Sequence, residues 1–218
     1  MKRLTPFIFT LLLIEFLDEF VFGAREAAWP LVRDDLNLTY TQIGMLLSLP
    51  GVIASFIEPV IGILGDVWKR RVLVLGGGVF FAGSLLLTAI SRDFGVLLLS
   101  FIIFYPSSGA FVSLSQAALM DEDPTRHEQN MARWTFAGSL GVVAGPLALG
   151  AAMIMGYGWR ALYAVFGILS LLAVAYAARF RFSKPSPIPT NSEKFPLDED
   201  DAPPLPFRED LRAAFQAA

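Results

Sequence analysis

Residues 62–71 read Gly62-Ile63-Leu64-Gly65-Asp66-Val67-Trp68-Lys69-Arg70-Arg71, so that one acid is followed closely by three cations. Long apolar runs flank this stretch: residues 36–57 carry no charge before it, and residues 72–90 carry none after it. The hydrocarbon core of a bilayer is about 30 Å thick and takes roughly 20 apolar residues in a helix. The stretch therefore predicts a short charged connection between two membrane-spanning helices.

The same pattern recurs along the first 182 residues. Charge-free runs mark further crossings at residues 94–120, 134–159 and 161–178. Residues 7–28, apolar but interrupted by charges, are expected to form the first helix, which Trp29-Pro30 would end. Backbone polar groups in lipid must bond within their own segment, and this favours helices over other structures. We therefore expect an all-α integral membrane fold, a six-helix transmembrane bundle over residues 1–182.

The composition supports a membrane protein and excludes several classes of function. Hydrophobic residues make up 55% of the 218 residues and charged residues 17%, against roughly 25% charged residues in soluble domains. The net charge of −3 argues against a nucleic-acid partner, because such proteins usually present a basic face. Cysteine is absent and His127 is the only histidine, so we expect no thiol chemistry, no metal site and no cofactor.

An enzyme is also not expected. Ser108-Gly109 superficially fits the serine motif of intramembrane proteases, but such a protease needs a histidine base on another membrane helix. His127, the only histidine, lies in an acidic loop outside the predicted spans.

The basic residues predict the orientation of the bundle. Lysine and arginine gather on the cytoplasmic side of membrane proteins. With the N-terminus in the cytoplasm, ten basic residues lie on that side and four on or near the other. The inner ten are Lys2, Arg3, Lys69, Arg70, Arg71, Arg126, Arg133, Arg179, Arg181 and Lys184, and the outer four are Arg25, Arg33, Arg92 and Arg160. We expect a multi-pass protein of the cell membrane with both termini cytoplasmic.

The composition changes after residue 182. Residues 183–206 hold seven of the fourteen prolines and the acidic run Asp198-Glu199-Asp200-Asp201, a composition typical of a disordered linker. Residues 207–218 regain helical spacing through Phe207, Leu211 and Phe215. They predict a short amphipathic cytoplasmic helix or, alternatively, the start of a connector to a further segment.

The predicted first helix carries an unusual set of charges. Glu15, Asp18, Glu19, Phe22 and Glu26 fall within about one third of its circumference, with Arg25 just beside them. An acid at the bilayer centre costs about 2.5–3.5 kcal/mol on the insertion scale. The face is therefore expected to meet a watery cavity, a cation or partner helices, and intramembrane acids are candidates for function. The structural alternative is pairing of Glu19 or Glu26 with Arg25.

Three further residues are candidates for a solute or proton pathway. Glu58, followed by Pro59, is expected to be a buried acid on the second helix, serving as a proton relay or satisfied by a neighbouring group. Tyr105 and Ser108, on either side of Pro106, bring polar groups to the fourth helix and could line a cavity.

The stretch at residues 62–71 resembles the loop motif of the major facilitator superfamily of transporters. The resemblance rests on Gly62, Gly65, Asp66 and the basic cluster Lys69, Arg70 and Arg71, although Lys69 stands where that family often has glycine. It implies that Asp66 latches against a helix of a second half. The alternative is that the cations only set topology and contact lipid phosphate.

A second motif lies on the predicted fifth helix, with Gly141, Gly145, Pro146 and Gly150. It resembles the glycine-proline motif of the antiporter branches of the same superfamily, except that a single glycine follows the proline, one residue late. The alternative is ordinary helix packing, because glycines spaced four residues apart let two helices approach closely.

Together these resemblances imply the N-terminal six-helix half of a twelve-helix transporter. The family has two such halves related by an axis along the membrane normal, with the substrate between them. The implied function is secondary active transport of a small solute by alternating access, with coupling to protons or cations and export as the direction. Many members carry an arginine on the fourth helix, which residues 94–120 lack, and this puts an arginine-based coupling mechanism in doubt.

The expected partners are the lipid bilayer, a small-molecule substrate and a second six-helix half. Three explanations for the second half stay open: a fragment or split product whose partner is encoded separately, a homodimer, or a remnant that does not transport. The competing function is a membrane scaffold or regulator derived from a transporter half.

Overall fold

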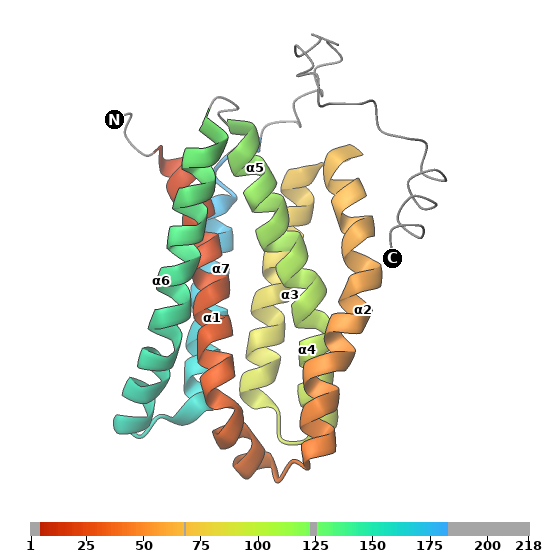
Figure 1. Ribbon diagram of the computed structural model, residues 1–218, viewed down its shortest axis with the longest axis vertical. Helices are drawn as coiled ribbons and strands as arrows, with labels where there is room; N and C mark the ends of the chain where they lie inside the picture. The colour runs from red at the N-terminus through yellow and green to blue at the C-terminus, as the bar shows by residue number, and fades with distance from the viewer. Residues whose placement is uncertain (1–4, 68, 123–125, 183–218) are drawn as a thin grey trace, which may run out of the picture. The chain divides into compact units, whose positions relative to one another are not determined.

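The structure, a computed structural model, describes residues 5–67, 69–122 and 126–182. Within these ranges the chain folds into helices that cross the bundle alternately in opposite directions (Figure 1). The predicted linker at 183–206 and the predicted helix at 207–218 lie outside the described residues. In chain order the helices are α1 (Pro6–Leu36), α2 (Tyr40–Val67), α3 (Arg70–Ile90), α4 (Phe94–Ser108), the π-helical turn η1 (Gly109–Ser113), α5 (Leu114–Glu122), α6 (His127–Ile154) and α7 (Gly158–Ala177).

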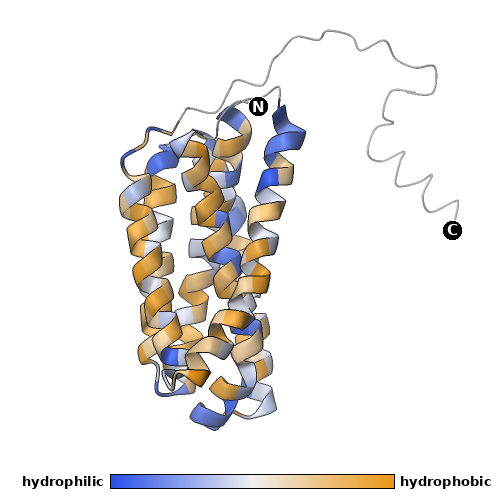
Figure 2. Cartoon of the chain, turned by 90° about the vertical axis from the view of Figure 1, so that its left-hand side faces the viewer, coloured by the Kyte–Doolittle hydropathy of each residue, from blue (hydrophilic) through white to orange (hydrophobic). Residues whose placement is uncertain are grey.

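The predicted six-helix membrane bundle is confirmed. Because α4, η1 and α5 follow one another as a single crossing, the described part of the chain crosses six times. Five of these crossings are long and apolar enough to span a bilayer, and α1, at 31 residues, is long enough but carries the charged face. Apolar residues also predominate along the helices of the bundle (Figure 2). We call the end with Pro6, Lys69 and Asp121 the amino end and the other the far end.

The first helix is longer than predicted. It starts where Thr5 accepts a hydrogen bond from the Ile8 amide at 3.2 Å and Pro6 takes the first turn, a combination typical of helix starts. The prediction that Trp29-Pro30 ends this helix is wrong. The helix continues to Leu36 and stops where Asn37 adopts a left-handed conformation. Proline lacks one backbone donor, and a membrane helix tolerates this loss where neighbouring groups satisfy the freed carbonyl.

The second helix also extends beyond its charge-free run. Thr39 and Gln42 bond reciprocally at its start, with Thr39 N–H donating to Gln42 Oε1 at 2.9 Å and Gln42 N–H to Thr39 Oγ1 at 3.2 Å, which is a capping box. The helix then runs through Glu58 and Pro59 to Val67. The residues 62–66 that were expected in a connection therefore form the last turns of α2. Charge-free runs mark only the hydrocarbon-buried part of a helix, and α2 continues past it.

The fifth crossing also extends beyond its charge-free run, and the turn after it has the expected form. The helix α6 begins at His127, seven residues before the predicted start at Trp134. The tight turn predicted at residues 156–158 is confirmed, because Gly156 and Gly158 both have positive φ angles of 78° and 73°, which favour glycine.

Aromatic residues fill the middle of the bundle. Phe81 of α3 is fully buried and its ring lies 5.0 Å from that of Phe104 and 5.8 Å from that of Phe111. Such centroid distances are typical of favourable aromatic packing. The helix α3 is thus anchored against α4 and the π-helical turn, whereas α2 and α6 expose most of their apolar side chains.

Candidate functional site

Asp18 and Ser108 meet between the first and fourth crossings. The Ser108 hydroxyl donates a hydrogen bond of 2.7 Å to Asp18 Oδ1. Asp18 lies 12 residues after the start of α1, about 18 Å along the helix axis, and so falls in the middle of the crossing. The structure therefore brings together one candidate from each of the two helices.

Glu15 and Glu19 of the same face lie toward α6. Glu15 is only 7% exposed, and a Cβ added at Gly138 would lie 2.6 Å from Glu15 Oε1 and 3.3 Å from Glu19 Cγ. Gly138 thus leaves the space that these two carboxyl side chains occupy. These three acids thus have two neighbours, with Asp18 toward α4 and Glu15 and Glu19 toward α6.

Glu58 reaches the same region from α2, although it is not the buried acid that the sequence suggested. Its side chain is exposed, because α2 lies at the edge of the described bundle. A Cβ added at Gly109 would lie 3.0 Å from Glu58 Cγ and 3.1 Å from Glu58 Oε1. Since Gly109 follows Ser108 directly, three crossings converge on the Ser108-Gly109 pair.

A break in helical regularity begins at this convergence. Residues 109–113 form a π-helical turn between α4 and α5, three residues after Pro106. Such turns are rare and are found frequently at functional sites. The sequence showed Pro106 and the small residues, but not the change of helical repeat.

Arg25 also belongs to this region, although the sequence analysis considered it only as a pairing partner for the acids. It is 6% exposed. Its Nη1 donates to the Tyr105 hydroxyl at 3.2 Å, and its Nε and Nη2 donate to Glu26 Oε1 at 3.2 and 3.0 Å. Its guanidinium carbon lies 4.9 Å from the centre of the Phe22 ring. The predicted pairing of Glu26 with Arg25 is therefore present, and Tyr105 and Phe22 lie at the same cation.

The basic cluster at the amino end connects four helices. Arg70 is buried, and its Nη1 donates to Asp121 Oδ2 at 2.5 Å and its Nη2 to Asp66 Oδ1 at 3.4 Å. Arg71 Nη2 donates to the Ala178 carbonyl, just after α7, at 2.5 Å. Lys69 is exposed at the start of α3. Two of the three cations thus have partners on other helices. The alternative that the cations only set topology does not account for these contacts.

The glycines of the cluster differ in their surroundings. A Cβ at Gly65 would lie 2.3 Å from Leu114 Cδ2, whereas a Cβ at Gly62 would meet nothing within 4 Å. Gly65 therefore allows α2 to approach α5, and Gly62 has no such role within the described bundle.

The glycines of α6 form a close seam with α1. A Cβ at Gly141 would lie 2.5 Å from the Phe16 carbonyl oxygen, and one at Gly145 would lie 2.3 Å from the Ala24 amide nitrogen. By contrast, Pro146 is exposed and Gly150 faces open space. This geometry supports the packing interpretation for the first two glycines of the motif.

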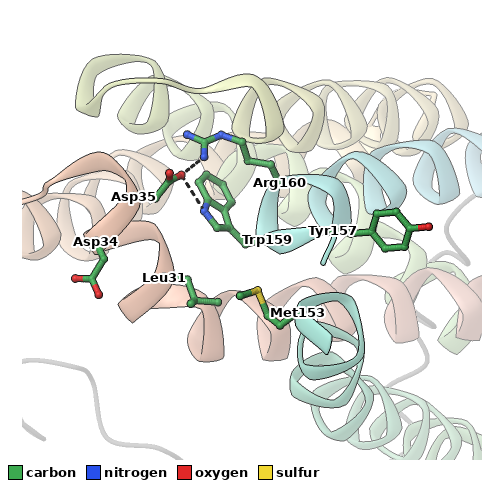
Figure 3. Close-up of a pocket in the computed structure, with 8 residues that line it drawn as sticks. Leu31, Asp34, Asp35, Met153, Tyr157, Trp159 and Arg160 are labelled. Carbon is green, nitrogen blue, oxygen red and sulfur yellow. Dashed lines mark hydrogen bonds and ion pairs between the residues drawn. The ribbon is translucent and has the colours of Figure 1, made fainter. Parts of the chain in front are cut away.

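A third cluster lies at the far end (Figure 3). Asp35, in the last turn of α1, accepts hydrogen bonds from Trp159 Nε1 at 3.1 Å and from Arg160 Nη1, and Arg160 Nη2 also donates to the Ser91 carbonyl at 2.8 Å. Asp35, Trp159 and Arg160 line part of an open pocket of about 400 Å³. Tyr157 also lines it, and its side chain points away from the ion pair. The cluster ties α1, α7 and the α3–α4 connection together.

The sequence profile of the Major Facilitator Superfamily matches residues 9–217. The chain belongs to this superfamily. Its curated relatives in the superfamily include the fosmidomycin resistance protein of Escherichia coli (strain K12), 28% identical over 180 residues, which cover 79% of this chain and 44% of the relative. The chloramphenicol resistance protein of Pseudomonas aeruginosa is 30% identical over 155 residues, which cover 70% of this chain and 37% of that protein. The chain thus spans less than half the length of these relatives.

Solved structures of major facilitator transporters share the fold. A bacterial homologue of the human lysosomal transporter Spinster, in an inward-facing and occupied conformation, matches with a TM-score of 0.71 at 14% identity, over 82% of this chain and 44% of that one. The peptide transporter POT in complex with sulfate matches with a TM-score of 0.67 at 20% identity, over 96% and 43%. At these identities the likeness concerns the fold alone. The chain is a multi-pass membrane protein of a transporter family.

Proposed function

We propose that the chain provides one half of a secondary active transporter that exports a small solute, coupled to protons or another cation. The contact between Asp18 and Ser108 carries this proposal. It joins a carboxyl group in the middle of α1 to the crossing in which the helical repeat changes, and it lies beside two further carboxyl groups. A purely structural membrane helix gains nothing from three acids at this depth, because each is costly to insert.

The apolar side chains exposed on α2 and α6 are consistent with contact to a second six-helix half. In a two-half transporter the solute site lies between the halves, and Phe22 and Glu58 are exposed on this one. Since the relatives are more than twice as long as the matched region, the second half is continuous with this chain, a separate chain, or a second copy. Alternating access then consists of rocking one half against the other around the acids of α1.

The amino end supports a cytoplasmic latch. The Asp66 side chain is 71% exposed while it contacts Arg70, so it remains accessible to a helix of the second half. The excess of lysine and arginine at this end supports a cytoplasmic position for it and for both termini.

Transport assays test the proposal directly. The relatives suggest fosmidomycin and chloramphenicol as first solutes, with accumulation measured in cells that express the chain together with its second half. Asp18→Asn is expected to reduce export to near the background, and Ser108→Ala to reduce it partly, because the first removes the titratable group and the second only its hydrogen bond. Asp34→Asn is the matched control, since Asp34 is exposed at the far end.

The outcomes separate transport from the alternative. If Asp18→Asn leaves export of every exported solute unchanged, the acid has no coupling role. If it weakens assembly with the second half without changing the flux per complex that still forms, the chain is a scaffold or regulator. Enzymatic turnover is not part of the proposal, in keeping with the transporter family.

A further inference from the structure

We infer that Arg25 and the aromatic side chains around it form a binding site for the anionic group, a carboxylate or a phosphonate, of an organic solute. The inference rests on the proposed transport function, whose solute it would help to define. The site consists of Arg25, Phe22, Phe104, Tyr105 and, as an exchangeable ligand, Glu26.

Arg25 is buried at a depth where an arginine needs partners. It lies 11 residues before the end of α1, about 16 Å along the helix axis, and is 6% exposed. An arginine at membrane depth needs compensation. Residues 94–120, which form the fourth crossing, contain no basic residue. Here the first helix supplies the cation, and the fourth helix supplies the Tyr105 hydroxyl that orients it.

The ion pair with Glu26 is poorly matched to the guanidinium. Both Nε and Nη2 of Arg25 donate to the same oxygen, Glu26 Oε1, whereas the favoured geometry uses two parallel bonds to two oxygens. Adjacent residues of a helix do not face each other, so this pair bends sideways from the helix. The Glu26 side chain is 45% exposed. Glu26 is therefore a carboxylate that an incoming anion can replace.

Three aromatic rings lie around the guanidinium group of Arg25. Its central carbon lies 4.9 Å from the centre of the Phe22 ring, 5.3 Å from that of Tyr105 and 5.9 Å from that of Phe104. These distances lie within the range of cation–π attraction. Phe104 is buried and Phe22 is 42% exposed, so the wall is closed on the α4 side and open at Phe22. An anion attached to an apolar or aromatic body fits such surroundings.

The site shares a face with Asp18. Arg25 follows Asp18 by seven residues, two helical turns or about 10 Å on the same side of α1. A solute anion at Arg25 and a coupling cation at Asp18 would therefore occupy neighbouring but separate positions, with Phe22 between them.

Binding to the detergent-purified chain tests the inference without requiring transport. The probes are benzoate, phenylphosphonate and the neutral analogue benzamide. Their binding is measured by isothermal titration calorimetry. Benzoate, phenylphosphonate or both are expected to bind, which identifies the anion class, and benzamide is expected to bind at least about tenfold more weakly, because it lacks the charge-assisted hydrogen bonds. Equal binding of benzamide would overturn the inference, as would no binding of either anion.

Four variants make the test specific. Arg25→Gln should abolish binding, and Arg25→Lys should weaken it about tenfold because a lysine lacks the planar fork. Glu26→Gln should tighten binding because it removes the competing carboxylate. Arg92→Gln, an exposed residue of the α3–α4 connection, is the charge-matched control and should bind as the unmodified chain does. Unchanged binding in Arg25→Gln, or weaker binding in Glu26→Gln, would overturn the site.

This inference and the proposed function fail in different ways. A chain that binds benzoate through Arg25 but exports nothing with its second half contradicts transport and leaves the anion site standing. Asp18→Asn should retain anion binding while losing coupled export. Export that proceeds equally in Arg25→Gln, with no anion binding in any variant, contradicts the anion site alone.

Discussion

Arg70 and Asp121 form an ion pair in which Nη1 and Oδ2 lie 2.5 Å apart, although 51 residues separate them in the sequence. The pair joins the start of α3 to the last turns of α5. The Arg70 side chain is 4% exposed and that of Asp121 is 26% exposed, so this contact is more protected from solvent than an ordinary surface ion pair. The amino end is thereby fixed by an interaction between the third and fourth crossings.

Asp121→Asn should destabilise the chain, because it leaves the buried guanidinium of Arg70 without its closest partner. The expected loss is roughly 2 kcal/mol, visible as a lower unfolding midpoint in detergent. Lys69→Gln, which alters an exposed cation next to Arg70, is the control and should shift the midpoint little. Replacing both Arg70 and Asp121 by apolar residues should recover part of the lost stability. If Asp121→Asn and the double variant have the same unfolding midpoint as the unmodified chain, the pair contributes nothing to stability.

Gly145→Ala should destabilise the seam between α1 and α6, since the new Cβ would lie 2.3 Å from the backbone nitrogen of Ala24. Overpacking of this kind costs about 1–3 kcal/mol. Gly150→Ala makes the same chemical change five residues along the same helix, where the new Cβ meets open space. Thermal unfolding of the two variants should differ clearly, with Gly150→Ala equal to or slightly above the unmodified chain. Equal destabilisation by both would contradict the seam.

Asp35→Asn should loosen the far end, because the carboxylate there accepts from both Trp159 and Arg160. Hydrogen–deuterium exchange is expected to increase in residues 158–162, at the start of α7, and to stay unchanged in the middle of α3. Asp34→Asn removes a neighbouring acid whose side chain is 76% exposed and serves as the control. Equal exchange in all three proteins would show that the cluster does not hold α7.

Single cysteines report the orientation, since the chain contains none of its own. A membrane-impermeant maleimide should label Arg92→Cys in intact cells and label Lys69→Cys only after the membrane is opened. These residues lie in connections at opposite ends of α3, so one crossing separates them. Labelling of both from the same side would contradict the crossing, and the reverse pattern would contradict cytoplasmic termini.

The crossings were predictable because hydrocarbon thickness imposes a length on apolar runs. The same rule misplaced the ends of helices, since α1 continues past Pro30 and α2 continues past Glu58. Charge marks where the apolar layer ends, whereas a helix ends where its backbone finds another partner, as at Asn37. Helix ends therefore depend on local backbone chemistry that a hydropathy pattern does not contain.

The candidate site was predictable in its residues and not in its contacts. Helical spacing placed Asp18 on the acidic face of the first helix, but Ser108 and Tyr105, the partners of Asp18 and Arg25, come from 90 and 80 residues away. Arg25 itself lay just beside that face in the sequence pattern. Its burial depends on how closely α4 approaches α1, and the order of residues along α1 does not determine that approach.

The π-helical turn at residues 109–113 has a consequence for how the fourth crossing tolerates changes in length. Such a turn holds one more residue than an α-helical turn, so everything after Ser113 is rotated by about 100° relative to a straight continuation of α4. Deleting one residue of the turn would restore an uninterrupted helix and bring a different side of α5 round to face α3. The surplus residue thus determines which side chains of α5 point inward at the amino end, while Tyr105 and Ser108 keep their direction.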